Sequence, residues 1–417
     1  GLGDVYKRQF VYIVKKEEDI MKKFNKFLSV AVASAMVMAM AGCGNTDNGS
    51  AATGTNAATE SAAASDSAAA SDSAASGSVF KIGGIGPTTG GAAVYGLAVQ
   101  HGAEIAIEEI NAAGGINGYQ VEFKFQDDEA DAEKSVNAYN ALKDWGAQII
   151  DGSTTSGACI AVTDKTKEDN MFQITPSGSA VECVQYDNNF RVCFSNPNQG
   201  LASAQYIGEN GLAEKIAVIY DSSDVYSSGI YEKFVKEAEN QPFEVVAAEA
   251  FTADNKTDFS VQLQKAKDAG ADMVFLPIYY QESALILTQA AAMGYAPKWF
   301  SCDGMDGILG GVDNFDVSLT EGVMLLTPFA ADATDDLTQS FVTKYKEKYG
   351  DTPNQFAADS YDAIYVIKAA IEKSGVTPDM SVSDICDGMK AAMTEITVDG
   401  LTGNGMTWTC LLYTSDA

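Results

Sequence analysis

Short apolar segments alternate with amphipathic segments along most of this chain, and this alternation constrains its fold more than any other feature. A first series begins at Val79, and the same order restarts after 196–198. In the amphipathic segments the apolar residues recur at helical spacing, as they do over 96–113, whereas the apolar segments have the length of buried strands. Strand–helix–strand units of this length place neighbouring strands parallel in one sheet. The sequence therefore predicts an α/β fold with two doubly wound parallel-sheet lobes.

The predicted elements divide the chain into two such series and a helix-rich return. Strands are predicted at 79–86, 119–125, 148–150, 171–175, 215–220, 243–248, 273–276 and 299–301. After 322–326 the order breaks, and three helical patterns follow in a row at 337–349, 355–373 and 383–393. A chain that returns in this way crosses between its lobes more than once. Ligands of such folds bind at the carboxyl ends of strands or in the cleft between lobes.

The N-terminal region has the pattern of an export signal. A basic segment begins at Met21, and an apolar run over 27–42 follows it that is too short to span a membrane. Residues 40–43, Met-Ala-Gly-Cys, resemble a bacterial lipobox, in which Cys43 is diacylated and becomes the mature N-terminus. An ordinary secretory signal with an incidental cysteine is the alternative. We expect a lipoprotein signal peptide at 21–42.

Three further stretches are predicted to lie outside the folded body. Residues 1–20 are expected to be upstream or adapter-derived sequence, and 410–417 an adapter-derived tail, so neither is used to predict the fold. The region 43–78 begins at Cys43 and contains no aromatic and no branched aliphatic residue, so it cannot form a core. We expect 43–78 to be a disordered tether between a lipid on Cys43 and the body.

Composition argues against several classes of function. The chain has 57 Asp and Glu residues against 27 Lys and Arg, a formal net charge of −30, so it would repel a nucleic-acid backbone. His101 is the single histidine, so no Ser-His-Asp triad is possible without it and no metal site can use two histidines. We therefore expect no catalysis, no metal, no cofactor and no nucleic-acid partner.

Two familiar motifs are only partly present. In 83–91 the third glycine position of a dinucleotide loop is Thr89, and Pro87 stands where the helix would begin. Residues 127–131 have the acidic residues of half a calcium loop, but they lack the glycine at the sixth position and the distant glutamate. We interpret the first as no nucleotide site and the second as a solvated acidic turn.

Hydroxyl-rich loops follow two neighbouring strands of the first series. Residues 152–158 follow a buried strand and open a helix, and 174–180 repeat the arrangement one unit later. Hydroxyls and free amides at a helix N-terminus bind anions, including carboxylates. Both loops lie at the carboxyl ends of strands, so they are predicted to face one cleft. Two helix caps without a ligand are the alternative interpretation.

Tyrosines and acidic residues occupy the corresponding places in the second series. They lie in 221–226, 278–282 and 301–304. Ordinary packing of the tyrosines and solvation of the acids is the alternative. A cleft with hydroxyls and amides on one wall, and tyrosines with an acid on the other, suits a zwitterion. Its carboxylate would meet Ser156, and its ammonium would meet Asp303 and a backbone carbonyl near Ser177.

These segments resemble the branched-chain amino-acid-binding proteins of ABC importers, type I periplasmic binding proteins, over 79–409. The resemblance lies in the order and spacing of motifs at 82–90, 95–96, 114–118, 127–128, 150–152, 156–157, 175–176, 220–221, 279 and 400–403. The family implies two lobes, joined by three crossovers, that close on one amino acid. On this basis 79–197 and 328–397 form the N-terminal lobe, and 198–327 and 398–409 form the C-terminal lobe.

The resemblance also implies which residues contact the ligand. Ser156 matches a serine that binds the α-carboxylate, Ser177 stands where the family contributes backbone, and Ser179 matches a hydroxyl. Asp303 stands where the family often has a glutamate that binds the α-ammonium. The aromatic residues that line the cleft are matched by Tyr95, Tyr226 and Tyr279.

Five cysteines remain once Cys43 and Cys410 are set aside. Cys183 and Cys193 flank a polar segment, 185–189, that could turn back on itself. We hypothesise a disulfide between them, which suits an exported protein, and two buried thiols are the alternative.

Together the residues and the resemblance predict an extracytoplasmic receptor for an amino acid, branched-chain or related, that delivers it to ABC permease subunits. The protein would be a monomer, lipid-anchored through Cys43 to the bacterial cell membrane. Two alternatives remain open. One is a binding protein for an amide or an aromatic acid, and the other is the ligand-binding lobe of a sensory system.

Overall fold

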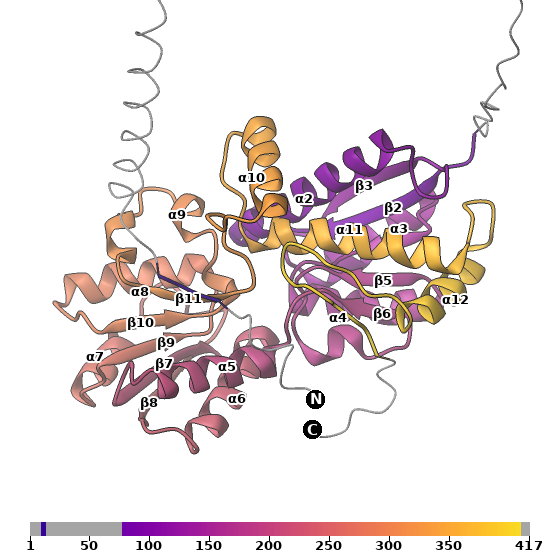
Figure 1. Ribbon diagram of the computed structural model, residues 1–417. Helices are drawn as coiled ribbons and strands as arrows, with labels where there is room; N and C mark the ends of the chain where they lie inside the picture. The colour runs from indigo at the N-terminus through magenta and orange to yellow at the C-terminus, as the bar shows by residue number, and fades with distance from the viewer. Residues whose placement is uncertain (1–9, 14–76, 410–417) are drawn as a thin grey trace, which may run out of the picture. The chain divides into compact units, whose positions relative to one another are not determined.

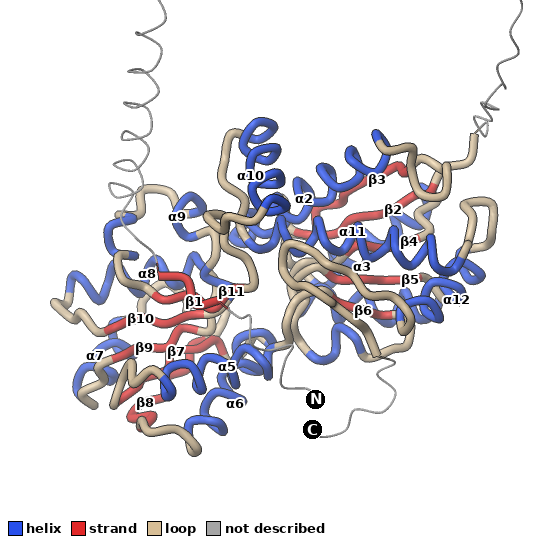
Figure 2. Tube along the Cα trace, in the orientation of Figure 1, coloured by secondary structure: helices blue, strands red, loops and turns tan. Residues whose placement is uncertain are grey.

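Two sheets of mainly parallel strands carry the fold. The computed structural model of the protein describes residues 10–13 and 77–409. Within these residues the predicted α/β architecture of two doubly wound lobes is confirmed, because strands alternate with helices along the chain and helices flank each sheet (Figure 1, Figure 2). No helix in this part of the chain has the length and apolar character needed to cross a membrane.

The sheet of the N-terminal lobe has five parallel strands in the order β3-β2-β4-β5-β6. They are β2 (Phe80–Gly86), β3 (Val121–Asp127), β4 (Ile149–Asp151), β5 (Phe172–Thr175) and β6 (Asn189–Arg191). The helices of this lobe are α2 (Ala93–Ala112), α3 (Ala132–Trp145), α4 (Ser156–Glu168), α10 (Asp336–Tyr349), α11 (Gln355–Ser374) and α12 (Val382–Met393). Strands β4 and β5 are buried along their whole length, as expected for a sheet covered on both faces.

The sheet of the C-terminal lobe has the order β1-β11-β10-β9-β7-β8. Its strands are β1 (Phe10–Ile13), β7 (Lys215–Asp221), β8 (Glu244–Phe251), β9 (Met273–Leu276), β10 (Lys298–Ser301) and β11 (Met324–Thr327). Its helices are α5 (Asn196–Glu209), α6 (Val225–Ala238), α7 (Ser260–Asp268), α8 (Tyr280–Ala292) and α9 (Ile308–Gly311). Strands β7 to β11 pair parallel with one another, and β1 pairs antiparallel with β11. The chain enters this lobe after β6 and leaves it after β11.

Strand β1 departs from the sequence-based expectation, which placed all of 1–20 outside the fold. Residues Phe10–Ile13 pair antiparallel with β11, with Phe10 opposite Thr327 and Ile13 opposite Met324. Without β1, strand β11 would be an edge strand of this sheet, with unpaired backbone groups that accept another strand.

The segment 398–409 also departs from the expectation, which assigned it to the C-terminal lobe. Its hydrogen bonds reach the N-terminal lobe instead. The buried carboxylate of Asp362 on α11 accepts bonds from the backbone N–H groups of Leu401 and Thr402, both at 2.8 Å. Trp408 Nε1 donates to the carbonyl oxygen of Arg191 on β6 at 2.8 Å. A buried carboxylate needs such donors, and this requirement places the segment over α11 and β6.

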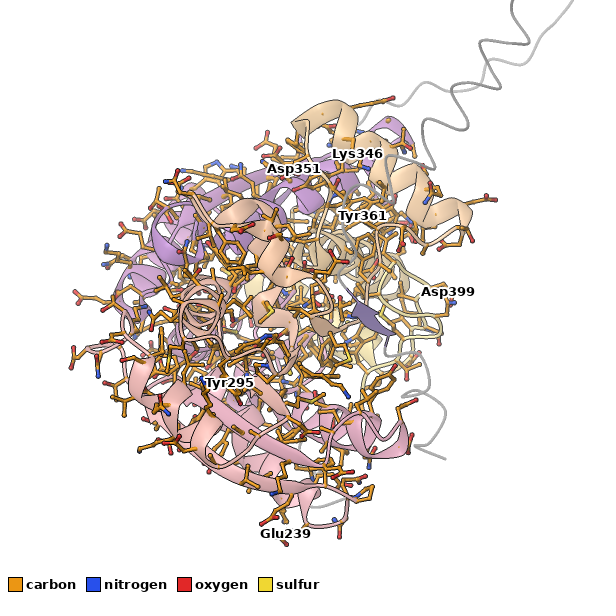
Figure 3. The ribbon with its side chains drawn as sticks, turned by 90° about the vertical axis from the view of Figure 1, so that its left-hand side faces the viewer. Glu239, Tyr295, Lys346, Asp351, Tyr361 and Asp399 are labelled. Atoms are coloured by element: carbon orange, nitrogen blue, oxygen red, sulfur yellow. The ribbon has the colours of Figure 1, made fainter. Side chains whose placement is uncertain are left out.

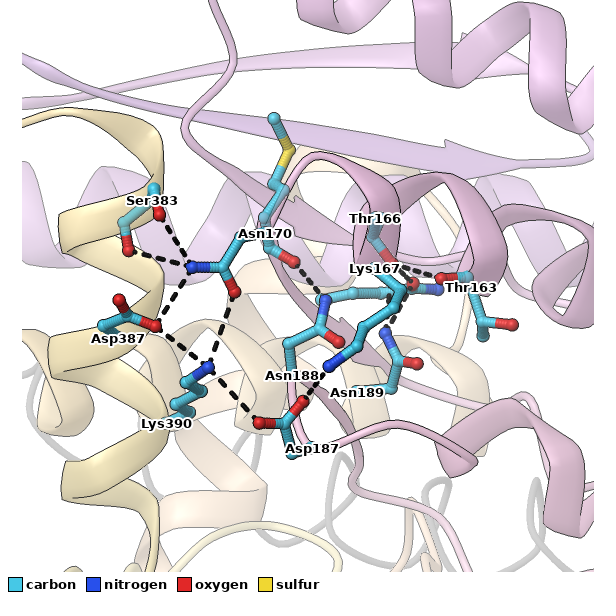
Figure 4. Close-up of polar contacts among 12 residues, drawn as sticks. Thr163, Thr166, Lys167, Asn170, Asp187, Asn188, Asn189, Ser383, Asp387 and Lys390 are labelled. Atoms are coloured by element: carbon cyan, nitrogen blue, oxygen red, sulfur yellow. Dashed lines mark hydrogen bonds and ion pairs between the residues drawn. The ribbon is translucent and has the colours of Figure 1, made fainter.

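Helix α12 is held against the N-terminal lobe by a polar cluster (Figure 4). The carboxylate of Asp187 accepts hydrogen bonds from Lys167 at 2.6 Å and from Lys390 of α12 at 3.3 Å. Asn170 Nδ2 donates to Ser383 Oγ at 2.8 Å and to Asp387 Oδ1 at 3.0 Å. Partly exposed ion pairs contribute only about 0–1 kcal/mol each, so this cluster mainly orients the helix.

Acidic residues are found both on the surface and in the interior. Glu239, Asp351 and Asp399 are exposed at the periphery (Figure 3), and exposed acids carry much of the negative charge predicted from composition. Other aspartates are buried, and these are Asp128, Asp151, Asp303, Asp359 and Asp362. The exposed acids need no partner, but each buried one requires a local explanation.

Helices α2 and α11 approach closely at Gly102. A Cβ atom added there would lie 2.0 Å from the carbonyl oxygen of Ala357, a backbone atom that cannot rotate away. We expect Gly102→Ala to lower the free energy of unfolding by about 1–3 kcal/mol, measured by urea denaturation. The control is Gly310→Ala, because its new Cβ would meet no atom within 4 Å. If both variants unfold at the same urea concentration, the close approach is not required.

Candidate ligand-binding site

A pocket lies between the two lobes, beside the carboxyl ends of β4, β5, β9 and β10. It is lined by Tyr95, Thr154, Thr155, Ser156, Ser177, Tyr226, Tyr279, Asp303, Gly304 and Phe356. Six of the seven residues predicted to contact a ligand are in this lining. The seventh, Ser179, lies directly behind it, because its backbone N–H donates to Ser156 Oγ at 3.2 Å. The structure thus brings the predicted residues together, while their contact with a ligand stays a prediction.

The N-terminus of helix α4 forms one end of the pocket. Thr155 is the N-cap residue, but its side chain makes no capping bond, and its buried Oγ1 has no hydrogen-bond partner among the described residues. Ser156 Oγ accepts hydrogen bonds from the N–H groups of Ser179 and Ala180, at 3.2 and 3.1 Å. The hydroxyl proton of Ser156 therefore remains available to donate to another acceptor. Free amides, a free hydroxyl proton and the positive end of the helix dipole together favour an anion here.

The second hydroxyl-rich loop supports the first. Ser177 Oγ donates to the carbonyl oxygen of Thr154 at 2.7 Å, so the serine hydroxyl proton is already used and its backbone groups remain. Ser179 is buried, and its Oγ has no partner within the described part of the chain. This loop therefore both fixes the position of α4 and offers one further hydroxyl near the anion end.

Asp303 forms the opposite end of the pocket and is the single carboxylate among the lining residues. It is 2% exposed. Its Oδ1 accepts from the Tyr226 hydroxyl at 2.5 Å, and its Oδ2 accepts from Gln199 Nε2 at 2.8 Å. Burial raises the pKa of Asp303 to about 6, although these two hydrogen bonds oppose the shift. At neutral pH the carboxylate is mostly ionised, so a buried negative charge faces the pocket.

Tyr95 connects the lobes across the pocket. It lies on α2 of the N-terminal lobe, and its hydroxyl donates to the carbonyl oxygen of Gly304 and accepts from the N–H of Tyr280 at 3.2 Å. The Tyr226 hydroxyl is also fully hydrogen-bonded within the protein, because it donates to Asp303 and accepts from the N–H of Gly304 at 2.8 Å. The predicted cleft-lining tyrosines Tyr95 and Tyr226 therefore present their rings, and not free hydroxyls, to a ligand.

Two residues of the site were not predicted from the sequence. Gln199 orients Asp303 from helix α5, and Phe356 lines the pocket from the first turn of α11. Neither follows a strand, so the rule that located the loops could not indicate them. The start of α5 does carry a local signal, since Ser195 Oγ accepts from the N–H of Asn198 and a proline lies in the first turn.

The predicted disulfide is not formed. All five cysteines of the described residues are free and buried. Cys183 Sγ points to the carbonyl oxygen of Ser156 at 3.7 Å and packs in one small cluster with Cys159. Burial raises the pKa of the Cys193 thiol, and the charges of Asp359 and Asp303 add to the shift. Of the two interpretations from the sequence, the structure has the two buried thiols.

The pocket carries no arrangement for metal binding or for histidine-based catalysis. Among the residues that the structure describes, no three His, Cys, Asp or Glu side chains group as metal ligands would. His101 lies away from the pocket lining, stacked on Tyr349 with ring centroids 3.7 Å apart. The lining instead offers an anion site and a buried carboxylate facing each other, which is an arrangement for binding.

Residues 79–410 match the family described as periplasmic binding protein. The chain belongs to this family. It is 31% identical over 302 residues to the leucine-, isoleucine-, valine-, threonine- and alanine-binding protein of Pseudomonas aeruginosa, covering 71% of this chain and 78% of the relative. It is 30% identical over 300 residues to a Leu/Ile/Val-binding protein homologue of Brucella melitensis, covering 72% of this chain and 80% of that relative.

Solved structures of periplasmic binding proteins share the fold. A branched-chain amino-acid-binding protein, LivJ, from Streptococcus pneumoniae in complex with isoleucine is 28% identical, with a TM-score of 0.69, covering 78% of this chain and 91% of that one. A leucine-binding protein, LivK, from Thermotoga maritima is also 28% identical with a TM-score of 0.69, covering 78% of this chain and 90% of that one. Family membership places the periplasmic binding protein outside the cytoplasm and makes it a solute-binding protein.

Proposed function

We propose that this periplasmic binding protein captures an amino acid between its lobes and delivers it to the permease of an ABC importer, acting as a monomer and without catalysis. One observation carries the proposal. An anion site at the start of α4 and the carboxylate of Asp303 line the same buried pocket, from opposite lobes. A zwitterion contacts both, so its binding energy stabilises the closed arrangement of the lobes.

The α-carboxylate would lie at the N-terminus of α4. Ser156 would donate its hydroxyl proton, because its oxygen already accepts two backbone bonds. Thr155 Oγ1 and the first amides of the helix would complete the site. Charge-assisted hydrogen bonds of this kind are about twice as strong as neutral ones.

The α-ammonium would lie against Asp303. Each oxygen of this carboxylate accepts one hydrogen bond from the protein, which leaves a lone pair on each for a ligand N–H. Gln199 and Tyr226 hold the carboxylate in place. Ser177 would contribute a backbone carbonyl to the ammonium, and Ser179 would contribute a hydroxyl near the α4 end of the pocket.

The relatives support this choice of ligand. The name of the Pseudomonas aeruginosa relative describes binding of leucine, isoleucine, valine, threonine and alanine, and the Brucella melitensis relative is named a homologue of Leu/Ile/Val-binding proteins. Calorimetric titration of the protein, freed of bound solute, with the standard amino acids tests the proposal. We expect at least one of them to bind, and its amide and its 2-hydroxy acid analogue, each lacking one charged group, to bind at least tenfold more weakly. If no amino acid binds, the proposal is wrong.

The affinity for the amino acid is expected to fall in acid. Because the pKa of Asp303 is raised to about 6, a falling pH protonates this carboxyl, and binding an ammonium then requires release of that proton. The dissociation constant should be constant between pH 7 and 8. It should rise roughly tenfold for each pH unit below the pKa, because one unit corresponds to about 1.4 kcal/mol. Calorimetry at pH 5 and 7.5 checks this, and equal affinities at the two values would contradict it.

We also propose that residues 21–42 are a lipoprotein signal peptide and that Cys43 carries the lipid anchor, with 43–78 as the tether. Residues 21–76 lie outside the described residues, so the proposal depends on the sequence pattern. Cys43→Ser is expected to move the protein from the membrane fraction to the soluble fraction. Cys386→Ser, which alters a buried thiol of the body, should leave it in the membrane fraction. Equal membrane association of the two variants would exclude the anchor.

A further inference from the structure

The segment 303–311 of the C-terminal lobe contacts the N-terminal lobe directly, beside the pocket. It follows β10 and contains the short 3-10 helix Asp303–Met305 and helix α9. Its partners in the other lobe are helices α2 and α11. We call this segment the clasp. The chain itself passes between the lobes elsewhere, after β6 and after β11, so the clasp adds a contact between lobes that the chain connections do not provide.

The first contact of the clasp is made by Gly304. Its carbonyl oxygen accepts the hydroxyl proton of Tyr95 from α2, and its N–H donates to the Tyr226 hydroxyl at 2.8 Å. The Tyr95 hydroxyl also accepts from the N–H of Tyr280 at 3.2 Å. These groups are buried, so moving the lobes apart would require each of them to find a new hydrogen-bond partner.

The second contact is a carboxylate that caps α11 from the opposite lobe. Asp306 Oδ2 accepts from the backbone N–H of Gln355, the first residue of α11, at 2.9 Å, and its Oδ1 accepts from the N–H of Gly307 at 2.9 Å. Asn354 caps the same helix from within the N-terminal lobe, but it accepts from a different N–H, that of Ala357. A carboxylate is favoured at a helix N-terminus both by its hydrogen bond and by the helix dipole.

The third contact is a close approach of the clasp backbone to α2. A Cβ atom added at Gly307 or at Gly311 would lie 2.5 or 2.6 Å from a methyl carbon of Val94. Gly307 also has a φ of +97°, in the region that favours glycine. Glycine at these two positions therefore allows the clasp to pack against the N-terminal lobe.

We propose that Asp306 is a positioning residue of the binding site, which holds the clasp against α11 and thereby favours the closed arrangement of the lobes. The inference rests on the proposed function, because it concerns the same site. Asp306 does not line the pocket. Asp303, the proposed partner of the ammonium, lies three residues before it on the clasp, and Phe356, which lines the pocket, follows Gln355 on α11.

This role predicts how a weakened clasp changes binding. A ligand that contacts both lobes binds the closed arrangement, so its apparent dissociation constant is the intrinsic value divided by the fraction of protein that is closed. Loss of the Asp306 contact lowers that fraction without altering any contact to the ligand. Every amino acid that binds should therefore lose affinity by the same factor.

The test compares Asp306→Ala with the conservative variant Asp306→Asn by calorimetry. Alanine removes the acceptor for the N–H of Gln355, whereas the amide oxygen of asparagine can still accept from it. We expect Asp306→Ala to raise the dissociation constants of all bound amino acids roughly threefold to tenfold, the effect of one lost hydrogen bond, and Asp306→Asn to recover part of the loss. Unchanged constants, a factor that differs between amino acids, or no recovery with asparagine would each overturn the inference.

Small-angle X-ray scattering of the proteins freed of bound solute tests the clasp without a ligand. Asp306→Ala should have a larger radius of gyration than the unsubstituted protein, and equal radii would overturn the inference. The matched control is Asp131→Ala, because the Asp131 carboxylate also accepts from a helix N–H, that of Lys134 at 2.9 Å on α3, but within one lobe. This control should lose thermal stability and keep both its radius of gyration and its dissociation constants. If no amino acid binds the unsubstituted protein, the proposed function is wrong, and scattering still decides whether Asp306 holds the lobes together.

Discussion

Asparagine in place of Asp303 is expected to weaken amino-acid binding by roughly tenfold to a hundredfold. Hydrogen bonds to charged groups contribute about 1.5–3 kcal/mol, and the substitution removes the single charge of the pocket lining while keeping the size of the side chain. The ammonium would then lose its counter-ion in a site shielded from water. Calorimetric dissociation constants at pH 7.5 measure the effect.

The fold should survive this substitution. In Asp303→Asn the new side-chain amide still accepts the Tyr226 hydrogen bond through its oxygen. Its NH₂ group would face Gln199, whose Oε1 has no partner within the described chain and can accept from it once the glutamine amide rotates. Asp303→Asn therefore tests binding rather than folding. A substitution that shortened the side chain would also remove the hydrogen bonds to Tyr226 and Gln199.

Asp128→Asn is the matched control for Asp303→Asn. Asp128 is likewise buried, and burial raises its pKa to about 6, but it lies outside the pocket lining. We expect its substitution to change the dissociation constant less than twofold. If the two variants bind alike, Asp303 is not the partner of the ammonium and the assignment of the two ends of the pocket fails.

The strands and most helices were predictable because their signals are local. Period-two and period-3.6 patterns extend over a few residues, and they located β7, β9, α10 and α11 to within about a residue at each end. Strand β6 was missed because three residues, Asn189–Arg191, are too few to show a period. Helix α5 was missed because Asn-Pro-Asn at 196–198 was interpreted only as the boundary between the two series, although proline is favoured in the first turn of a helix.

The errors in domain assignment arise from contacts between distant residues. Segment 398–409 joins the N-terminal lobe because Asp362, about 40 positions earlier, is buried and needs its N–H groups. No pattern within 398–409 contains that information. Likewise, nothing in Phe10–Ile13 alone indicates that β11 will offer an unpaired edge.

The candidate site was largely predictable because topology, rather than sequence detail, determines where strand ends meet. Loops after β4 and β5 must share an edge of their sheet, so Ser156 and Ser177 could be placed together without coordinates. The state of each hydroxyl could not be predicted. Whether Tyr95 offers its hydroxyl to a ligand depends on Gly304, more than 200 residues away, and only the structure shows that this hydroxyl is already bonded.

The protein is expected to be more stable at pH 5 than at pH 8, which is opposite to the usual behaviour of salt-bridged carboxylates. Burial raises the pKa to about 7 for Asp151 and to about 6 for Asp128, Asp224, Asp303, Asp306 and Asp362. In the unfolded chain these groups have pKa values near 3.9. A carboxyl whose pKa is higher in the folded state binds its proton more tightly there, so its contribution to stability is greatest below about pH 4 and is lost as pH rises through 6 to 7.

Carboxylates with lowered pKa values do not cancel this trend. Asp169 and Asp187, whose pKa values are held low by lysine and tyrosine partners against some burial, lose their stabilising effect only near or below the unfolded pKa of about 3.9. Between pH 5 and 8 they remain ionised in both states. Urea denaturation at pH 5, 6.5 and 8 should therefore show a rising midpoint as pH falls, and a midpoint that is equal or higher at pH 8 would contradict the prediction.

Asp151 is expected to account for a large part of the effect. It is fully buried at the end of β4, where Ser360 Oγ donates to its Oδ2 at 3.1 Å and its Oδ1 has no partner among the described residues. At pH 8 its ionised form lacks the donors that a buried charge needs. Asp151→Asn keeps an acceptor for Ser360 and removes the charge, so we expect it to raise the free energy of unfolding by about 2–4 kcal/mol at pH 8 and by much less at pH 5. Equal gains at the two pH values would mean that the substitution acts through packing and that the Asp151 carboxyl does not titrate between them.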